Sequence, residues 1–347
     1  GDEFALLMEC CDIIQANRIA QNILKTFKQF RFYWPENLFQ VGVSIGVIPI
    51  DRPNMKLEKV LKLADQACYA AKEAGRNRYI LLRDEETNTL QRQTDLRWAS
   101  LINEALEKNQ FQLYQQKIQP IAKHPDGERY EILLRFPDPG SKRTIAPSAF
   151  LNSAERYDLL PAIDHWVVST VLQWLEQHPE QLGKLASCSI NLSGRTIGEE
   201  THAQRILDLL QASSVPAEKI CFEITETAAI SCSSLAACHM NAIRNLGCKF
   251  ALDDFGVGLA SFNYLKNLPI DILKIDGSFV LPMLDNPLDH AMVRSINEVG
   301  HIMGKQTIAE FVNSRQLLEG LTAIGIDFVQ GYHIAKPIPL NGITTLN

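Results

Sequence analysis

Carboxylate side chains close several short apolar runs in the second part of this 347-residue sequence. They are Glu131, Glu223, Asp253, Asp254 and Glu310. A charged group in an apolar run costs free energy unless it is paired or bound to a metal ion. Carboxylates that converge also repel one another, which a divalent cation relieves. The residues therefore predict a cation site. With Asn191 as a further donor the ligands are all oxygens, which suits Mg²⁺ or Mn²⁺ rather than zinc.

The adjacent pair Asp253 and Asp254 favours two ions, because one carboxylate can bridge both while its neighbour binds the second. Two such ions clamp the attacking and leaving oxygens of a phosphoryl displacement. Lys274, within an apolar run, is a candidate to orient the attacking water or to help deprotonate it. Arg135 offers a planar guanidinium to a phosphate. The residues alone predict a two-metal enzyme that acts on a phosphodiester or a phosphate.

Each of these residues also has a purely structural interpretation. A carboxylate at the end of a strand can cap a helix, Asn191 can be a turn residue, and Arg135 can form a salt bridge. The histidines in helical segments lack a metal-binding partner at four-residue spacing, so we expect them to pack. These histidines are His165, His239 and His301. The prediction of a metal site thus depends on the combination of groups.

Eight short apolar runs follow residue 110, and helical patterns separate most of them. The runs span 111–118, 130–136, 186–193, 219–226, 249–254, 270–276, 306–310 and 327–332. Strands that alternate with helices in this number predict an α/β fold, a (β/α)8 TIM-type barrel, whose catalytic groups meet at one face. The first connection contains Pro120, Pro125 and Gly127 and no helical pattern. The first strand should therefore be antiparallel to the second. An open doubly wound sheet is the alternative.

The first 83 residues predict a separate, partial α+β segment. It has an apolar, strand-like run at 4–8, a helix over 11–30, a β-branched strand over 39–50, a helix over 57–74 and a strand over 79–82. A polar stretch over 84–97 then leads into a helix. We therefore expect a partial domain over residues 1–83, a linker helix over 84–108 and the barrel over 109–347.

Composition and charge exclude several classes of function. The chain is 46% hydrophobic and 21% charged, as globular proteins are. A formal net charge of −6 argues against binding to polymeric nucleic acid, which needs a basic surface. The eight cysteines form no CxxC pair, and no apolar run approaches ~18 residues, so we expect a cytoplasmic protein. The sequence opens inside a strand-like pattern, so we expect that an upstream sensory or membrane domain lies outside this chain.

Residues 111–339 resemble the EAL-domain family of cyclic di-GMP phosphodiesterases. The motif that names the family corresponds to Glu131, Ile132 and Leu133 in YEILLRF, and INLS, FEITET, LDDFG, LKID, IAE and QGY follow in order. The resemblance implies a barrel with an antiparallel first strand, Mg²⁺ or Mn²⁺ as cofactor, and hydrolysis of cyclic di-GMP to linear pGpG. It also implies a homodimer, formed by the loop after Asp254 and the helix after Lys274.

The resemblance also implies roles for individual residues. The implied ligands of the first metal ion are Glu131, Asn191, Glu223 and Asp253. Those of the second are Asp253, Asp254 and Glu310. The residues implied to position the attacking water are Lys274 and Gln330. Those implied to contact the substrate are Arg135, Gln115 and Asp276. Glu226 is implied to brace the loop after the aspartate pair.

The sequence departs from the family pattern at four positions. Val257 stands where threonine or serine is usual, which is expected to loosen the loop after the aspartate pair. Gln116 follows Gln115 in place of a proline, and Phe311 and Asn313 replace a common glycine and glutamate. None of these changes removes an implied ligand, so we expect an active enzyme. The alternative is a weakly active or non-hydrolysing cyclic di-GMP receptor that signals by conformational change or dimerisation.

Residues 1–82 resemble the second half of a GGDEF, diguanylate cyclase-like, domain. The matching segments are GDEF at 1–4, VGVSIGVI at 41–48 and ADQACYAAKEAGRNRY at 64–79. In that family the first of these forms a hairpin that binds GTP, with Asp2 and Glu3 at its tip. The family's first strand and phosphate loop have no counterpart in this sequence. We therefore do not expect this chain to synthesise cyclic di-GMP.

Overall fold

The structure is a computed structural model of the chain. It describes residues 4–9, 11–34, 37–40, 42–50, 56–73, 75–81, 84–122, 127–138, 144–230, 234–256, 264–266 and 268–340. The chain divides into two compact units, residues 1–97 and 98–347. Asp2, Glu3 and Val257, singled out in the sequence, lie outside the described residues.

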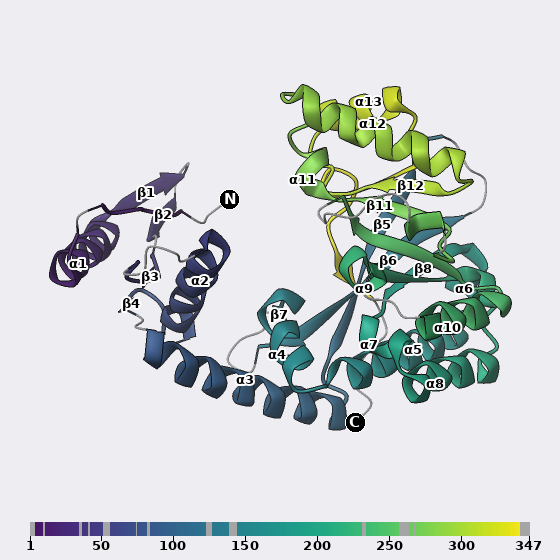
Figure 1. Cartoon of the computed structure of the whole chain (residues 1–347), viewed down its shortest axis with the longest axis horizontal. Coiled ribbons are helices and arrows are strands. Elements are labelled where there is room, and N and C mark those ends of the chain that lie inside the picture. The colour runs from purple at the N-terminus through teal and green to yellow at the C-terminus, as the bar shows by residue number, and fades with distance from the viewer. Residues whose placement is uncertain are drawn as a thin grey trace. The chain divides into compact units, whose positions relative to one another are not determined.

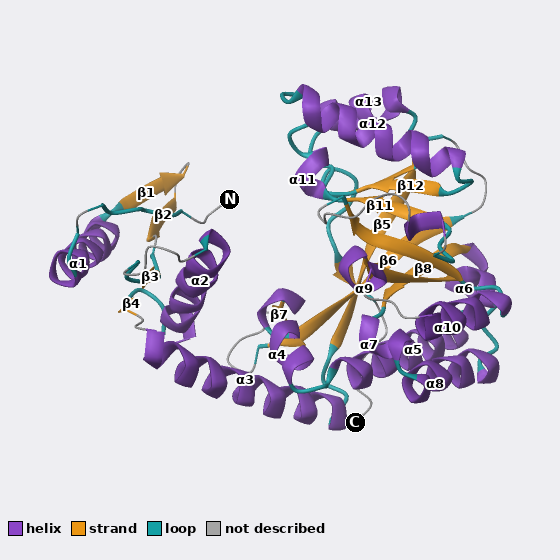
Figure 2. Cartoon of the chain, in the orientation of Figure 1, coloured by secondary structure: helices purple, strands orange, loops and turns teal. Residues whose placement is uncertain are grey.

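Before residue 84, the described residues of the first unit form two helices and two small sheets (Figures 1 and 2). Its elements are α1 (Ile13–Gln29), β1 (Arg31–Trp34), β2 (Asn37–Gln40), β3 (Ile45–Val47), α2 (Leu57–Glu73) and β4 (Tyr79–Leu81). Strands β1 and β2 pair antiparallel, and β3 and β4 pair parallel. Helix α1 begins where the Asp12 carboxylate accepts a hydrogen bond from Gln15 N at 2.7 Å, which satisfies one of the free N–H groups of its first turn. Gly46 lets α2 pack closely on β3, since a β-carbon there would lie 2.7 Å from the side chain of Ala67.

Two expectations for this unit were wrong. The single strand expected over 39–50 is divided into β2 and β3, which pair with different partners. Between them Val43 N donates to the side chain of Asn77 at 3.3 Å rather than to a neighbouring strand. The apolar run Phe4–Met8 forms no strand within the described residues, and Phe4 is exposed. A hydrophobic pattern without a neighbouring strand supplies no partner for the backbone.

Helix α3 (Asp84–Glu107) contains the boundary between the two units. In its second half Trp98, Ile102 and Ala105 are buried, at the spacing that places side chains on one helical face. Trp98 packs edge-on against Phe136, with ring centroids 5.3 Å apart. This end of the helix is therefore part of the second unit's core.

The second unit is a closed barrel of eight strands, as expected (Figures 1 and 2). In barrel order the strands are β5 (Gln112–Pro120), β6 (Glu128–Pro137), β8 (Leu185–Asn191), β9 (Ile220–Thr225), β10 (Lys249–Phe255), β11 (Ile272–Ile275), β12 (Gln306–Ala309) and β13 (Phe328–Gln330). Strand β5 is antiparallel to both neighbours, β6 and β13, and all other neighbours are parallel. The antiparallel first strand is therefore confirmed, and the open sheet is excluded.

The remaining elements connect or extend these strands. Two short strands, β7 (Thr144–Ile145) and β14 (Ile338–Pro339), add to β6 and β5. The helices are α4 (Leu151–Arg156), α5 (Leu160–Gln177), α6 (Pro179–Lys184), α7 (Gly194–Gly198), α8 (Glu200–Ala212), α9 (Glu226–Ile230), α10 (Ser234–Asn245), α11 (Gly277–Val280), α12 (Pro287–Ile302) and α13 (Arg315–Ile324). Three-residue 3₁₀ helices begin at Pro147, Ala217 and Tyr264.

An apolar cluster fills part of the barrel interior. It takes one buried residue from each of six strands: Ile118, Cys221, Ala251, Ile272, Ile308 and Phe328. Residues two apart on a strand face the same side of the sheet. The polar residues two positions further along these strands should therefore also face inward. This cluster forms the base on which the site is built.

Candidate active site

A polar layer lies two residues beyond the apolar cluster on each of those six strands. Its members are Gln116, Glu223, Asp253, Lys274, Glu310 and Gln330. On the five parallel strands the polar residue follows the apolar one, and on the antiparallel β5 it precedes it. The period of the strand thus converts six separate sequence positions into one ring of polar groups inside the barrel.

Asp253 and Asp254 are brought to the same site by an irregularity in β10. Successive strand residues normally point to opposite faces. Here Leu252 pairs with Leu273 but Phe255 pairs with Ile275, so two residues of β10 oppose one residue of β11. Asp254 also has a left-handed backbone, with φ of 54°. Such a bulge re-aims a side chain, and it lets both aspartates reach the mouth.

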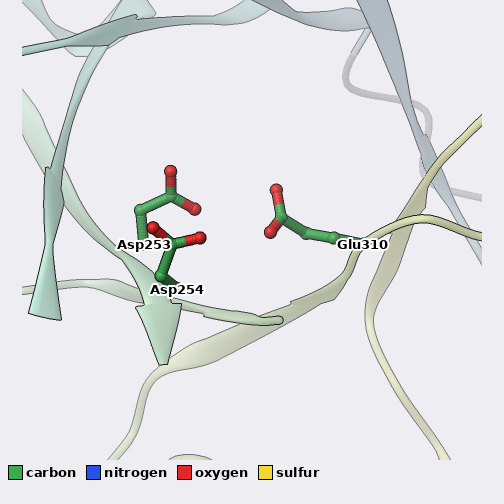
Figure 3. A group of neighbouring side chains, drawn as sticks. All are labelled: Asp253, Asp254 and Glu310. Carbon is green, nitrogen blue, oxygen red and sulfur yellow. The ribbon is translucent and has the colours of Figure 1, made fainter. Parts of the chain in front are cut away.

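Both aspartates face Glu310, which follows β12 (Figure 3). One carboxylate oxygen from each of Asp253, Asp254 and Glu310 lies within 4.8 Å of the other two. Glu310 N donates to Ile275 O at 3.1 Å, which continues the pairing of β11 with β12 by one residue. This hydrogen bond fixes the backbone from which the Glu310 side chain projects. The three groups form a cluster that suits a hard cation.

Lys274 projects from β11 into the centre of the carboxylates and is 1% exposed. Its Nζ lies 2.6 Å from Glu223 Oε2, 2.9 Å from Asp253 Oδ1 and 2.9 Å from Glu310 Oε1. A fourth carboxylate, that of Glu131, is 3.6 Å away. One ammonium therefore faces several acidic groups and cannot neutralise them all.

The pKa values at the site reflect this excess of carboxylates. Burial, with the neighbouring Asp253 and Glu131 carboxylates, raises the pKa of Glu310 to about 8 against the opposing effect of Lys274. Glu223 has its pKa raised to about 8 for the same reasons. Burial and the adjacent Asp253 raise the pKa of Asp254 to about 6. Burial by itself lowers the pKa of Lys274, but the surrounding carboxylates raise it well above its ordinary value.

Amide side chains hold Glu131, the first residue of the family's naming motif. Asn191 Nδ2 donates to Glu131 Oε1 at 2.8 Å, and Gln330 Nε2 donates to Glu131 Oε2 at 2.7 Å. Gln116 Oε1 lies 3.3 Å from the same Gln330 nitrogen, and Gln116 Nε2 donates to Ala335 O at 3.0 Å. Gln116, regarded above only as a departure, is thus part of the site. Its two-residue spacing from Ile118 is the signal that identifies it.

Unpartnered oxygen atoms test whether these residues fit a metal ion. Among the described residues, Glu223 Oε1 and Gln330 Oε1 are buried without a hydrogen-bond partner. Such atoms are costly unless they are satisfied. Oxygen donors, surplus negative charge and unsatisfied lone pairs together fit a hard divalent cation, and no sulfur or imidazole competes in this layer. The residues of the site therefore fit the expected cofactor.

Two further predicted residues support the mouth of the barrel. Glu226 Oε2 accepts a hydrogen bond from Gly256 N at 2.9 Å, which ties the turn after the aspartate pair to the end of β9. Gly256 has φ of 104°, and a β-carbon there would lie 2.8 Å from the Phe279 ring. Asp276 accepts from Ser278 N at 2.8 Å and so caps α11.

Arg135 and Gln115 are not members of this polar layer. Arg135 is four residues beyond Glu131 on β6, and its guanidinium lies 5.4 Å from the centroid of the Tyr114 ring. Burial lowers the pKa of Arg135. Gln115 is adjacent to the inward-facing Gln116, so the alternation of side chains along a strand places it on the other face of β5. Its backbone pairs with Ile338 of β14.

One buried carboxylate near the site was not predicted. Asp164 of α5 accepts hydrogen bonds from Ser193 N at 2.9 Å, Ser193 Oγ at 2.7 Å and Thr196 Oγ1 at 2.6 Å. It thereby fixes the turn that follows Asn191. Burial raises the pKa of Asp164 against these hydrogen bonds. Nothing in its helical sequence context marks it, because its partners are about thirty residues away.

His239 and His301 have structural partners. His239 Nδ1 lies 2.8 Å from Ile197 O, and His301 Nε2 lies 3.0 Å from Asp327 Oδ2. His165 borders a shallow surface pocket with Arg205 and Asp208. This pocket lies between α5 and α8, which cover the outside of the barrel, and so is separate from the acidic layer.

The fold and the acidic layer define a barrel protein with a cluster of carboxylates at one mouth, a donor set that suits hard cations. The EAL domain family model matches residues 100–337, and this chain belongs to that family. The model for the diguanylate cyclase, GGDEF domain matches residues 1–78. Both resemblances recognised in the sequence are thus confirmed.

Similar proteins include curated enzymes and solved EAL domains. Cyclic di-GMP phosphodiesterase PdeB of Shewanella oneidensis is 38% identical over 343 residues, which are 98% of this chain and 40% of that protein. Cyclic di-GMP phosphodiesterase PdeF of Escherichia coli is 32% identical over 327 residues, 92% of this chain and 42% of that protein. The chain therefore spans about two fifths of these relatives.

Among solved structures, the FimX EAL domain from Pseudomonas aeruginosa bound to c-di-GMP matches with a TM-score of 0.64 and 29% identity. The match covers 69% of this chain and 96% of that one. The c-di-GMP complex of the PaMucR phosphodiesterase matches with a TM-score of 0.64 and 27% identity over 70% of this chain. Within the described part of this chain, no helix has the length and apolarity needed to cross a membrane.

Proposed function

We propose that this chain hydrolyses cyclic di-GMP to linear pGpG with two Mg²⁺ or Mn²⁺ ions. The observation that carries the proposal is the cluster of Asp253, Asp254 and Glu310 within 4.8 Å, beside the buried Lys274. Relatives named as cyclic di-GMP phosphodiesterases and EAL structures that contain c-di-GMP support the choice of substrate.

The residues divide into two overlapping ligand sets. Those proposed for the first ion are Glu131, Asn191, Glu223 and Asp253, and those for the second are Asp253, Asp254 and Glu310. The ions would activate water and stabilise the charge that develops on the phosphate. The chain's own groups then set the geometry. Asn191 and Gln330 hold the Glu131 carboxylate by both its oxygens.

Lys274 is the proposed positioning group for the attacking water. Its ammonium is held at three carboxylates, so its location is fixed before substrate binds. A preorganised donor of this kind loses little free energy to rearrangement when charge develops. The proposed contacts to the substrate are Arg135, Asp276 and the Gln115 segment. Glu226 is the proposed brace for the loop of the aspartate pair.

A chromatographic assay for pGpG, with cyclic di-GMP and Mg²⁺ as reactants, tests the proposal. Glu131→Ala should abolish turnover, because it removes a proposed metal ligand. Glu128→Ala is the matched control, since Glu128 lies exposed on the same strand. If the wild-type chain binds cyclic di-GMP without forming pGpG, it is a receptor rather than an enzyme. Normal turnover by Glu131→Ala would show that the site is wrongly assigned.

Homodimerisation remains a separate proposal. The helix after Lys274 and the segment that follows it expose Leu281, Leu284 and Leu288. Exposed apolar side chains so close together are typical of an interaction surface. Sedimentation analysis of the wild-type chain and of Leu284→Glu tests it. A dimer that the substitution converts to monomer supports the proposal, and a monomeric wild-type chain contradicts it.

A further inference from the structure

Phe311, directly after Glu310, has a conformation that stability of the fold does not explain. Its φ is 55°, in the left-handed region that bulky residues seldom adopt. The residue is 59% exposed, so it gains little free energy from burial. Glycine at this position would avoid both costs. Local strain that the fold does not need is characteristic of functional positions.

Hydrogen bonds on both sides of Phe311 hold this backbone conformation. Before it, Glu310 N donates to Ile275 O at 3.1 Å. After it, Val312 N donates to Gln330 O at 3.0 Å, and Val312 O accepts from His333 N at 3.0 Å. The segment is therefore fixed to both neighbouring strand ends, and the direction of the Phe311 side chain is set in advance.

Gly277 supports the ring of Phe311 from one side. A β-carbon at position 277 would lie 2.6 Å from Phe311 Cγ and 2.8 Å from Phe311 Cβ. The aromatic side chain thus lies directly against the backbone at the start of α11, next to Asp276. Because the residue is nevertheless 59% exposed, the ring is supported on one side and open on another.

The position of this ring suggests what it binds. Glu310, its neighbour in the chain, is a member of the acidic cluster at which a phosphodiester would be cleaved. A nucleotide held there by its phosphate carries a planar base on the ribose attached to that phosphate. Aromatic side chains bind bases by stacking, because every base has a π-face. We propose that Phe311 is a stacking platform for one purine base of the cyclic dinucleotide, an inference that rests on the proposed function.

Three substitutions separate stacking from strain and from general apolarity. Phe311→Gly removes both ring and strain, Phe311→Leu keeps the strain and an apolar side chain, and Phe311→Tyr keeps the ring. We expect Phe311→Gly and Phe311→Leu to raise KM and the calorimetric Kd for cyclic di-GMP by about 5- to 150-fold. This is the range that the loss of one stacked base implies. The kcat should change less than KM. Phe311→Tyr should retain most of the affinity for cyclic di-GMP that Phe311→Leu loses. Because its backbone strain is relieved, Phe311→Gly should melt at a higher temperature than the wild type.

The control is Ile302→Ala, which truncates another exposed apolar side chain at the far end of α12. It should leave KM unchanged. The stacking platform is wrong if Phe311→Gly and Phe311→Leu keep the wild-type KM and Kd. It is also wrong if Phe311→Tyr binds cyclic di-GMP as weakly as Phe311→Leu does. A loss of activity that follows loss of a dimer in light scattering would assign the ring to a contact between copies and also overturn it. A wild-type chain that neither binds nor hydrolyses cyclic di-GMP would overturn the proposed function together with the platform.

Discussion

The ammonium of Lys274 lies 2.6 Å from the carboxylate of Glu223, and both side chains are fully enclosed in the barrel. They come from β11 and β9, on either side of the bulged strand β10. This pair links the ligand sets proposed for the two metal ions, because the same ammonium also contacts Asp253 and Glu310.

Lys274→Met should abolish turnover and also destabilise the metal-free barrel. Removing one partner from a buried ionic group leaves uncompensated charge, which costs about 3–5 kcal/mol. Urea denaturation of the chelator-treated protein measures this, and added Mg²⁺ should recover part of the loss. Lys108→Met is the control, because the Lys108–Glu104 pair is exposed. Equal stability of the two variants would contradict a central role for Lys274.

Divalent cations should stabilise the folded protein through the acidic cluster. A ligand that binds only the native state stabilises it by mass action, about 2.7 kcal/mol at a hundredfold excess over Kd. The melting temperature should therefore rise with Mg²⁺ or Mn²⁺ and fall again with EDTA. Asp253→Asn, which weakens the residue shared by both proposed ions, should largely remove the response. A full metal response in that variant would place the ions elsewhere.

Glu226→Ala should weaken metal binding without removing a ligand. The substitution deletes the acceptor for Gly256 N, two residues beyond Asp254. Loss of such supporting contacts typically costs about 10–100-fold in metal affinity. Glu226→Gln retains an acceptor oxygen and should lie between the alanine variant and the wild type. Metal titrations followed by calorimetry measure the order, and an alanine variant with wild-type affinity would contradict the brace.

The stability of Asp164→Asn should depend on pH differently from that of the wild type. Because burial raises the pKa of Asp164, the folded state holds its proton at a pH where the unfolded state has lost it. The stability that the protonated carboxyl contributes is fully present below the unfolded pKa, about 3.9, and is lost as pH rises through the folded value. The asparagine variant, which cannot ionise, should therefore gain relative to the wild type as pH rises.

Thermal melts of the wild type and Asp164→Asn at several pH values from about 4 upward measure this difference. Asp158→Asn is the control, because it makes the same chemical change at an exposed position near the same turn. A difference between Asp164→Asn and the wild type that is constant with pH would contradict the assigned protonation.

The sequence by itself predicted the barrel, with an open sheet as the alternative, the direction of its first strand and the acidic character of several strand ends. Those features follow from local patterns. Strand periodicity places residues two apart on the same face, and a connection that contains proline and glycine but no helical pattern favours a hairpin between the first strands. The same reasoning was insufficient in the first unit, where the run over 39–50 was divided because its two ends pair with different strands.

The tertiary structure alone decided how the site is assembled. Asp253 and Asp254 share one site because two residues of β10 oppose a single residue of β11, and this register depends on a distant strand. Gln116 reaches Gln330 only when β5 closes the barrel, and Asp164 reaches the turn after Asn191 only when α5 packs on it. Phe311 is held in its strained conformation by hydrogen bonds to β11 and β13. Each of these relationships joins residues far apart in the chain, so local periodicity carries no record of them.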